Sequence, residues 1–352
     1  MDGKQLTHRI SKNWRAEQMT ENKRKMNISR LICAFLLVSG ILFACGNPNT
    51  LPTRSDPAPE KDRGNQEISA KLNKILLINS NAAVEKYRVV QEEFKKTVPN
   101  PIKEVDLGSK KEMNADIAGM SSYNPDIIYC IGGKAYSLAN KHFSDKPIVF
   151  SSIINWLRLP RLSRKLYGVS NELHPRMPIF MFRSVFQGIE KIGMLYSPQY
   201  TSEWFENTKS QAKELGLEII GRAVSDKTQT LLILKQLLPD VDAMWMISDP
   251  LVMGEKKYLY EILKICDINK TPVFSYHHIF AKLGAVLIVS VDDPTIGRQT
   301  ANIAMGVLSG DEIDEKVQFP AGSHVVLNLK KVNDYGLEYN KNALGLINDI
   351  IK

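Results

Sequence analysis

Short apolar runs alternate with amphipathic stretches from Asn73 onward, and this alternation constrains the fold more than any other feature of the chain. The first run, 75–78, is continuous, as expected of a strand buried on both faces. In the stretch 83–97, apolar residues recur at spacings of three and four, which predicts a helix. The pattern then predicts strands at 126–131, 147–150, 191–196, 217–221, 243–247, 272–275 and 285–289, and helices at 135–142, 178–187, 202–215, 228–238, 254–266 and 295–309.

Strands and helices in alternation imply right-handed crossovers, and therefore parallel sheets that helices cover on both faces. About nine such units exceed what one compact doubly wound sheet holds. We therefore expect an α/β fold made of two Rossmann-like parallel-sheet lobes. No fixed-period repeat is present.

The net charge of +8 is concentrated at the N-terminus. Residues 1–44 hold eight basic and three acidic residues, so the rest of the chain carries only +3. A basic stretch, 23–30, precedes an apolar run of 14 residues, 31–44. Because a spanning helix needs about 20 apolar residues, this run is typical of an export signal and not of a permanent anchor. Residues 1–44 are therefore expected to be a signal peptide.

Leu42-Phe43-Ala44-Cys45 resembles a bacterial lipobox, in which the cysteine receives a lipid before cleavage. We expect Cys45 to carry acyl chains such as palmitate and to anchor the protein on the extracytoplasmic side of a membrane, the periplasmic face in a Gram-negative cell. An uncleaved short anchor or a coincidental cysteine remains the alternative. Residues 45–70 hold this cysteine and a polar, Pro-rich stretch that is expected to be a flexible tether.

Cys130 and Cys266 both lie in apolar segments, where a cysteine packs as a small hydrophobic residue. They are assigned to different lobes, so a disulfide between them would lock the two lobes together. We predict free thiols.

In parallel α/β sheets, ligands bind beyond the carboxyl ends of the strands, where helices begin. The loops at those positions are short and polar in this chain. Each of their residues taken singly could equally be an ordinary helix cap. The candidate ligand-binding residues are Asn79, Ser80, Asn81, Gly132, Gly133, Ser151, Ser152, Asn155, Ser197, Tyr200, Thr201, Ser202, Asp249 and Ser275.

Several segments follow one another in an order that is specific for one family: 150–155, 168–170, 192–198, 212–218, 241–243, 284–285, 297–299 and 308–310. Through them, residues 73–345 resemble the ABC transporter substrate-binding proteins of the tryptophan/tyrosine type, which have the type I periplasmic binding protein fold. The resemblance implies two lobes, joined by three crossing strands, that close over a small solute and present the closed form to a membrane permease. The first lobe is expected at 71–186 and 290–322, and the second at 187–289 and 323–352.

The resemblance also implies roles for single residues. Thr201 and Ser202 match hydroxyls that face the ligand in the family, and Ser151 and Ser152 match the small residues after a Val-Phe strand. Asp249 matches the family's acidic residue, which would bind the ammonium group of an amino acid.

The chain departs from the family pattern at two aromatic residues. Trp156 follows Asn155 where the family usually has Asp-Pro, and Tyr167 stands where the family has Thr. A large ring at the cleft would either stack on a ligand or fill its space.

An enzyme is not indicated. The chain has no G-x-G-x-x-G motif, no P-loop and no G-x-S-x-G elbow. His277 and His278 are adjacent, and neighbouring side chains of an extended segment point to opposite sides, which disfavours a shared metal. We expect a monomeric binding protein without catalytic residues, cofactor, metal or nucleic-acid partner. A ligand-sensing lipoprotein that signals its bound state to a membrane receptor remains the alternative, because the same fold serves both roles.

Overall fold

The computed structural model describes residues 73–108 and 116–352. The expected signal peptide, Cys45 and the tether lie outside these residues. Within the described ranges, no helix combines the length and the hydrophobicity needed to cross a membrane.

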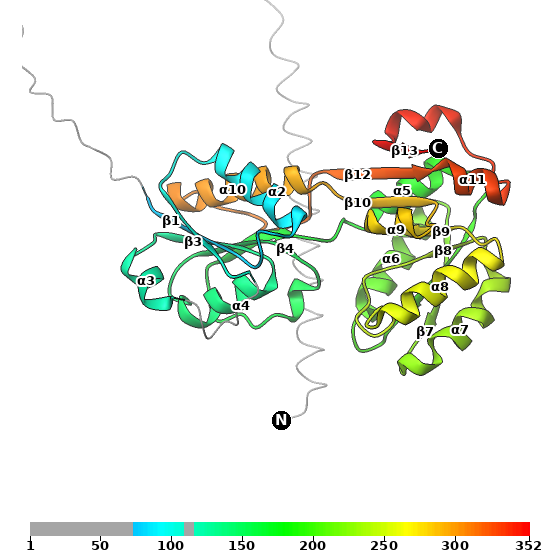
Figure 1. Cartoon of the computed structure of the whole chain (residues 1–352), viewed down its shortest axis with the longest axis horizontal. Coiled ribbons are helices and arrows are strands. Elements are labelled where there is room, and N and C mark those ends of the chain that lie inside the picture. The colour runs from blue at the N-terminus through cyan, green and yellow to red at the C-terminus, as the bar shows by residue number, and fades with distance from the viewer. Residues whose placement is uncertain (1–72, 109–115) are drawn as a thin grey trace, which may run out of the picture. The chain divides into compact units, whose positions relative to one another are not determined.

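The first sheet has six strands in the order β11-β5-β4-β3-β1-β2, and all of its strand pairs are parallel. Helices α2 and α10 cover one face of this sheet, and helices α3 and α4 cover the other (Figure 1). The central strands are completely buried, as their continuous apolar runs predict. The bounds are β1 (Ile75–Asn79), β2 (Ile102–Asp106), β3 (Ile127–Ile131), β4 (Ile148–Ile153), β5 (Leu166–Ser170), β11 (Val317–Gln318), α2 (Glu85–Thr97), α3 (Ile117–Ser122), α4 (Gly133–His142) and α10 (Asp293–Ser309).

The second sheet has seven strands in the order β13-β12-β10-β9-β8-β6-β7. Strands β10 and β12 pair antiparallel, and the other strand pairs described in this sheet are parallel. The strand bounds are β6 (Lys191–Tyr196), β7 (Glu218–Ala223), β8 (Ala243–Trp245), β9 (Val273–Ser275), β10 (Leu287–Val291), β12 (Ser323–Asn328) and β13 (Asp349–Ile351).

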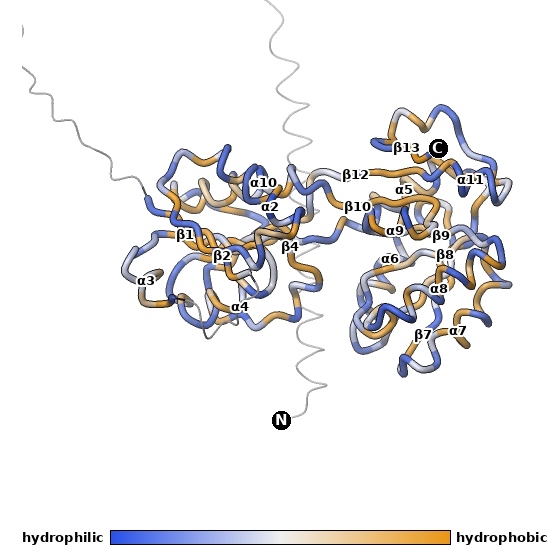
Figure 2. Tube along the Cα trace, in the orientation of Figure 1, coloured by the Kyte–Doolittle hydropathy of each residue, from blue (hydrophilic) through white to orange (hydrophobic). Residues whose placement is uncertain are grey.

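Helices cover both faces of the second sheet as well. Helices α5, α6 and α11 pack on one face, and α7, α8 and α9 pack on the other. Their bounds are α5 (Arg176–Val185), α6 (Ser202–Glu214), α7 (Thr230–Leu237), α8 (Lys256–Ile268), α9 (Ile279–Lys282) and α11 (Leu329–Tyr335), and short 3-10 turns lie at η2 (Trp156–Arg158), η3 (Lys227–Gln229), η4 (Leu238–Asp240) and η5 (Lys341–Leu346). Figure 2 shows hydrophobic residues concentrated along the strands of both sheets.

Two sheets, each sandwiched between helices, confirm the predicted fold class. We call the body around the first sheet the first lobe and the body around the second sheet the second lobe. The chain passes between them at 171–175, at Asp292 and at 319–322, which agrees with the three crossings that the resemblance implied.

The crossings contact one another. The ring of His174 lies edge-on to that of Phe319 with centroids 5.0 Å apart, and the Asp292 backbone N–H donates to the Gly322 carbonyl at 3.3 Å. A Cβ added at Gly322 would lie 2.9 Å from the Thr295 hydroxyl, so the close approach of two crossings requires glycine here.

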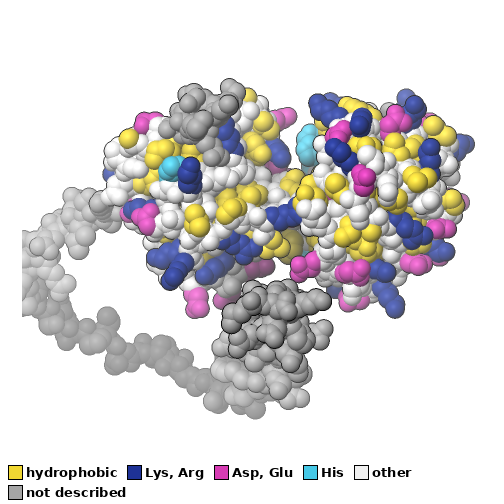
Figure 3. Space-filling model, turned by 90° about the horizontal axis from the view of Figure 1, so that it is seen from below, with side chains coloured by type: hydrophobic (Ala, Val, Ile, Leu, Met, Phe, Trp, Pro, Cys, Tyr) yellow, Lys and Arg dark blue, Asp and Glu magenta, His cyan; other side chains and the backbone are white. Residues whose placement is uncertain are grey.

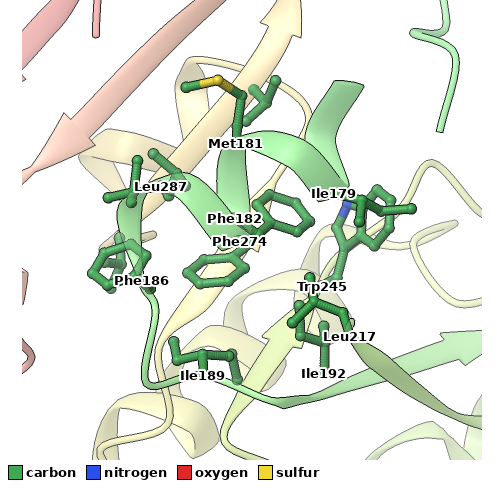
Figure 4. Packing of buried hydrophobic residues seen from close by; sticks show 14 of the residues in the cluster. Ile179, Met181, Phe182, Phe186, Ile189, Ile192, Leu217, Trp245, Phe274 and Leu287 are labelled. Carbon is green, nitrogen blue, oxygen red and sulfur yellow. The ribbon is translucent and has the colours of Figure 1, made fainter. Parts of the chain in front are cut away.

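Helix α5 lies with the second sheet, although the sequence assigned residues up to 186 to the first lobe. The ring of Phe182 packs in a tilted orientation on Phe274 of β9, with centroids 4.6 Å apart, and contacts Trp245 of β8 edge-on at 4.9 Å (Figure 4). The ring of Phe186 stacks on Phe274, with centroids 5.4 Å apart. This aromatic cluster fixes α5 to the second lobe, so the crossing comes before the helix and not after it.

The predicted free thiols are confirmed. Cys130 lies in β3 and Cys266 in α8, and both are buried and unpaired. They belong to separate hydrophobic clusters, one in each lobe.

Candidate functional site

One pocket takes its walls from both lobes and encloses about 910 Å³, including the part that opens to solvent. The lining residues are Lys86, Ile154, Asn155, Asn171, Glu172, Leu173, Pro178, Thr201, Trp204, Trp245, Ile247, Ser248, Tyr276, His277, His278, Val289, Ser290, Val291 and Asp293.

The first lobe and the first crossing supply charged groups of both signs to this pocket. Lys86 comes from the first turn of α2, Asp293 from the first turn of α10 and Glu172 from the crossing at 171–175. The Oδ1 atom of Asp293 is buried and has no hydrogen-bond partner among the described residues. A cation and two acids thus line the pocket, and one acid has an acceptor free for a ligand.

Burial changes the acidity of all three groups. It raises the pKa of Asp293 to about 6, against the opposing charge of Lys86. It also raises the pKa of Glu172, which a backbone N–H from Asn155 and the charge of Arg158 partly offset. The pKa of Lys86 is lowered by burial, and the charge of Asp293 opposes that shift. A ligand that carries both charges would relieve these costs, because it would pair with both kinds of group.

The second lobe supplies aromatic rings. Trp204 of α6 and Trp245 of β8 meet edge-on with centroids 5.5 Å apart, and Tyr276 follows β9. Trp245 is itself held by Phe182, so its ring belongs to a rigid core and not to a loop. The pocket is therefore lined by charged groups from the first lobe and the first crossing, which we call the charged wall, and by rings from the second lobe, which we call the aromatic wall.

His277 and His278 both line this pocket, which corrects the expectation that they point to opposite sides. Their rings lie 4.3 Å apart, because the chain bends directly after β9 and does not stay extended. Burial, together with the charges of His278 and Lys86, lowers the pKa of His277 to about 4. His277 is therefore a neutral hydrogen-bonding group at pH 7.

Of the fourteen candidate residues, Asn155 and Thr201 line the pocket. Most of the others bond within the protein. The side chain of Asn79 donates to Gln91 at 2.6 Å and accepts from the Asn81 backbone N–H at 2.9 Å. The hydroxyl of Ser80 accepts from the Ala135 backbone N–H at 3.0 Å and so caps α4.

Of the two candidate glycines, Gly132 serves the packing of the same two loops and Gly133 does not. Gly132 has φ +81°, and an added Cβ would lie 2.7 Å from the Ser80 hydroxyl. An added Cβ on Gly133 would meet nothing within 4 Å. The loops after β1 and β3 are therefore joined to each other.

Three candidate serines are buried in or directly after strands. The hydroxyl of Ser151 lies 2.7 Å from that of Tyr129. Ser152, at φ +59°, and Ser275 have hydroxyls without a hydrogen-bond partner among the described residues. None of the three belongs to the pocket lining.

Asp249 is 1% exposed, and both of its carboxylate oxygens accept bonds from the protein. Oδ2 accepts from the backbone N–H and the hydroxyl of Ser197 at 2.8 and 2.6 Å and from the Thr201 hydroxyl at 2.5 Å. Oδ1 accepts from the backbone N–H groups of Leu251 and Val252 at 2.8 and 3.0 Å. Burial alone would raise the pKa of Asp249, but these bonds lower it overall. The carboxylate holds two loops together, which differs from the ammonium-binding role that the resemblance implied.

The remaining candidates of this loop face outward or across the lobes. The hydroxyl of Ser202 donates to the Pro198 carbonyl at 2.9 Å. The guanidinium of Arg158, a residue of the first lobe, lies over the ring of Tyr200. Its Cζ atom is 4.1 Å from the centroid of that ring.

Neither aromatic departure from the family pattern lines the pocket. Trp156 packs on Phe150 at 5.7 Å beneath the guanidinium of Arg161, and Tyr167 packs in the core of the first lobe near Lys316. Both fill space within the first lobe.

The charged wall is what the sequence reasoning missed. Lys86 lies inside a helical pattern, and Asp293 stands directly before a proline at a helix start, so each has an ordinary solvent-exposed explanation. The one sequence feature that could have indicated Lys86 and Asp293 is their place in the first turn of a helix that follows a strand. Such a turn lies at the carboxyl edge of the sheet, where ligands bind.

Comparison with known proteins agrees with this architecture. Residues 71–350 match the family model described as ABC transporter substrate binding protein. No curated protein sequence matches the chain. Among solved structures, an ABC domain from Streptococcus pneumonia in complex with L-Trp is 18% identical, with a TM-score of 0.56, over 80% of this chain and 100% of that one. A ligand-free, open substrate-binding protein with adhesive properties from Clostridium difficile is 16% identical, with a TM-score of 0.60, over the same shares.

These structures share the fold, and the family model spans both lobes and the pocket between them. The chain therefore belongs to the ABC transporter substrate-binding protein family.

Proposed function

We propose that this protein is an exported, lipid-anchored solute-binding protein that captures a small zwitterion, such as an amino acid, and delivers it to an ABC permease. The observation that carries the proposal is that the pocket combines charged groups from the first lobe and the first crossing with aromatic rings from the second lobe.

Such a pocket suits a ligand with a charged head and an apolar body. An ammonium group would lie against Asp293 and Glu172, and a carboxylate against Lys86. The apolar body would lie between Trp204, Trp245 and Tyr276, which offer large faces at low entropic cost. The solved relative with bound L-Trp supports an amino acid as the first ligand to test.

The placement of the pocket between the two lobes also supports a mechanism of capture by closure. Each lobe holds only half of the complementary surface, so the ligand binds the closed form better than the open one. A differential of about 5.5 kcal/mol would convert a 99:1 excess of open form into a 99:1 excess of closed form. Delivery then requires a partner that recognises the closed form.

Thermal unfolding of the full chain in detergent tests capture. A ligand present at 100 times its dissociation constant adds about 2.7 kcal/mol to the free energy of unfolding. We expect at least one amino acid to raise the Tm and to be recovered unchanged. Conversion of that ligand into a product would point to an enzyme instead.

A test of lipid anchoring has a matched control within the expected signal peptide, because the apolar run 31–44 contains another cysteine, Cys33. Radiolabelled palmitate should mark the wild type and Cys33→Ser but not Cys45→Ser. Label retained in Cys45→Ser would contradict the assigned lipidation site.

Crosslinking in membranes distinguishes delivery from sensing. The closed protein should crosslink to a permease subunit in a ligand-dependent manner. Ligand-dependent crosslinking to a membrane receptor would support the sensing alternative.

A further inference from the structure

The segment that follows β4 contributes Ile154 and Asn155 to the pocket lining and touches the second lobe at two places. The guanidinium of Arg158 lies 4.1 Å from the centre of the Tyr200 ring, and its Nη2 donates to the Gln199 carbonyl at 3.3 Å. The side-chain amide of Asn155 donates to the Ser248 carbonyl at 3.5 Å. These contacts join residues that lie 41 and 93 positions apart in the chain.

The first-lobe side of this contact is fixed by local structure. Asn155 adopts a left-handed conformation, φ +54°, which turns the chain out of β4 and into the 3-10 turn η2. Trp156 then packs on Phe150 of β4 at 5.7 Å, with Arg161 above its ring at 4.6 Å. The turn is therefore anchored to the first sheet, and Arg158 projects from a rigid base.

The second-lobe side is fixed by the buried carboxylate of Asp249. It binds Ser197 and Thr201, which flank the turn that carries Gln199 and Tyr200. The backbone N–H groups of Tyr200 and Thr201 both donate to the Ser197 carbonyl, at 3.1 and 3.0 Å. The contact thus joins two constrained turns, so that its formation costs little side-chain and loop entropy.

The same segment reaches the ligand pocket through Glu172. The backbone of Asn155 and the positive charge of Arg158 both lower the pKa of Glu172, against the effect of burial. Exposed basic side chains at Arg158, Arg161, Arg164 and Lys165 surround this region of the first lobe. Figure 3 shows Lys and Arg side chains on the underside of the first lobe, and both acidic and basic side chains on the second lobe.

We propose that Arg158 and Tyr200 form an interlobe latch, a pair whose stacking stabilises the arrangement of the two lobes in which these residues are in contact. The guanidinium is suited to this role because it is planar and can stack on a ring while it donates to a carbonyl. The inference rests on the proposed function only in that the lobes open and close, and it does not depend on which ligand binds.

Hydrogen–deuterium exchange of the ligand-free full chain in detergent tests the latch. Arg158→Ala should speed amide exchange at 199–204 on the opposite lobe by about threefold, and Tyr200→Leu should speed exchange at 155–160 by a similar factor. Tyr200→Phe should behave as wild type, because it keeps the ring. The double variant Arg158→Ala/Tyr200→Leu should exchange no faster than either single variant, because a pair can be broken only once.

Arg161→Ala is the matched control, because that guanidinium stacks on Trp156 within the first lobe. It should leave exchange at 199–204 unchanged. Equal effects of Arg158→Ala and Arg161→Ala on 199–204, or additive effects in the double variant, would overturn the latch. Neither result would bear on whether the pocket binds an amino acid, since no ligand is present in the experiment.

Discussion

Ser197 donates both its backbone N–H and its hydroxyl to the same carboxylate oxygen of Asp249, at 2.8 and 2.6 Å, although the two residues stand 52 positions apart. Replacing this carboxylate would leave several buried backbone donors without an acceptor. We expect Asp249→Ala to lower the free energy of unfolding by about 3 kcal/mol in urea titrations.

Asp240→Ala is the control, because Asp240 pairs with Arg222 at 3.1 Å on the surface. It should change stability by less than about 0.5 kcal/mol. Normal stability of Asp249→Ala combined with a loss of ligand affinity would instead support the ligand-binding role that the sequence suggested.

The pH dependence of stability provides a second test of the hydrogen bonds to the Asp249 carboxylate. Because its bonds hold the pKa of Asp249 below the ordinary value of 3.8, its contribution to stability is complete above that value and is lost as the pH falls through the lowered pKa. The difference between wild type and Asp249→Ala should therefore persist at pH 5 and shrink only in strong acid. A difference that disappears at pH 5 would contradict the lowered pKa.

Asp293 should behave in the opposite way, because burial raises its pKa to about 6. Between its ordinary value and pH 6, the folded protein binds a proton that the unfolded chain lacks, so this group's contribution to stability falls as the pH rises. Asp293→Asn should raise the Tm of the ligand-free protein by about 2 °C at pH 7.5 and have no effect below pH 4.

The same substitution should weaken binding of an amine-bearing ligand, since its charged partner is lost. The exposed Asp314→Asn serves as control and should alter neither quantity. A lower Tm for Asp293→Asn at pH 7.5 would show that the carboxylate has a partner in the free protein.

Trp204 tests the aromatic wall. Because its ring lines the pocket, Trp204→Ala should weaken ligand binding by about 30-fold, and Trp204→Phe should have an intermediate effect. Tyr260, an exposed ring on α8, offers the matched control. Calorimetric titration measures all three variants, and equal losses in Trp204→Ala and Tyr260→Ala would remove Trp204 from the site.

The adjacent glycines Gly132 and Gly133 should differ in the effect of an alanine substitution on stability. Gly132→Ala should lower stability by about 1 to 3 kcal/mol, because its φ of +81° and the Ser80 hydroxyl both oppose a Cβ. Gly133→Ala should leave stability unchanged or raise it by about 0.5 kcal/mol, since it begins a helix in open space. The reverse order in thermal unfolding would contradict the packing described for these loops.

The sequence predicted the sheets better than the pocket, for physical reasons. Continuous apolar runs such as β1 and β3 give a clear signal because both faces are buried. The edge strand β2 was missed because its sequence, IKEVD, is half exposed and carries charges. Helix α5 was given to the wrong lobe because its apolar face reveals burial but not which sheet it meets.

Candidate ligand residues were harder to predict, because small polar residues after strands serve two purposes. Ser80 caps a helix and Ser197 binds a buried carboxylate, and each has the same local sequence character as a ligand contact. Lys86 and Asp293 reach the pocket only because the sheet and the crossing bring two helix starts together. That juxtaposition is a property of the topology and leaves no local pattern.

The most direct test of the account is isothermal titration calorimetry of the full chain in detergent with each of the twenty amino acids. We predict saturable one-to-one binding of at least one of them, lost or strongly weakened in both Trp204→Ala and Asp293→Asn and retained in Tyr260→Ala. The absence of binding by any amino acid, or binding that survives both pocket substitutions, would contradict the proposal that the interlobe pocket captures a zwitterion.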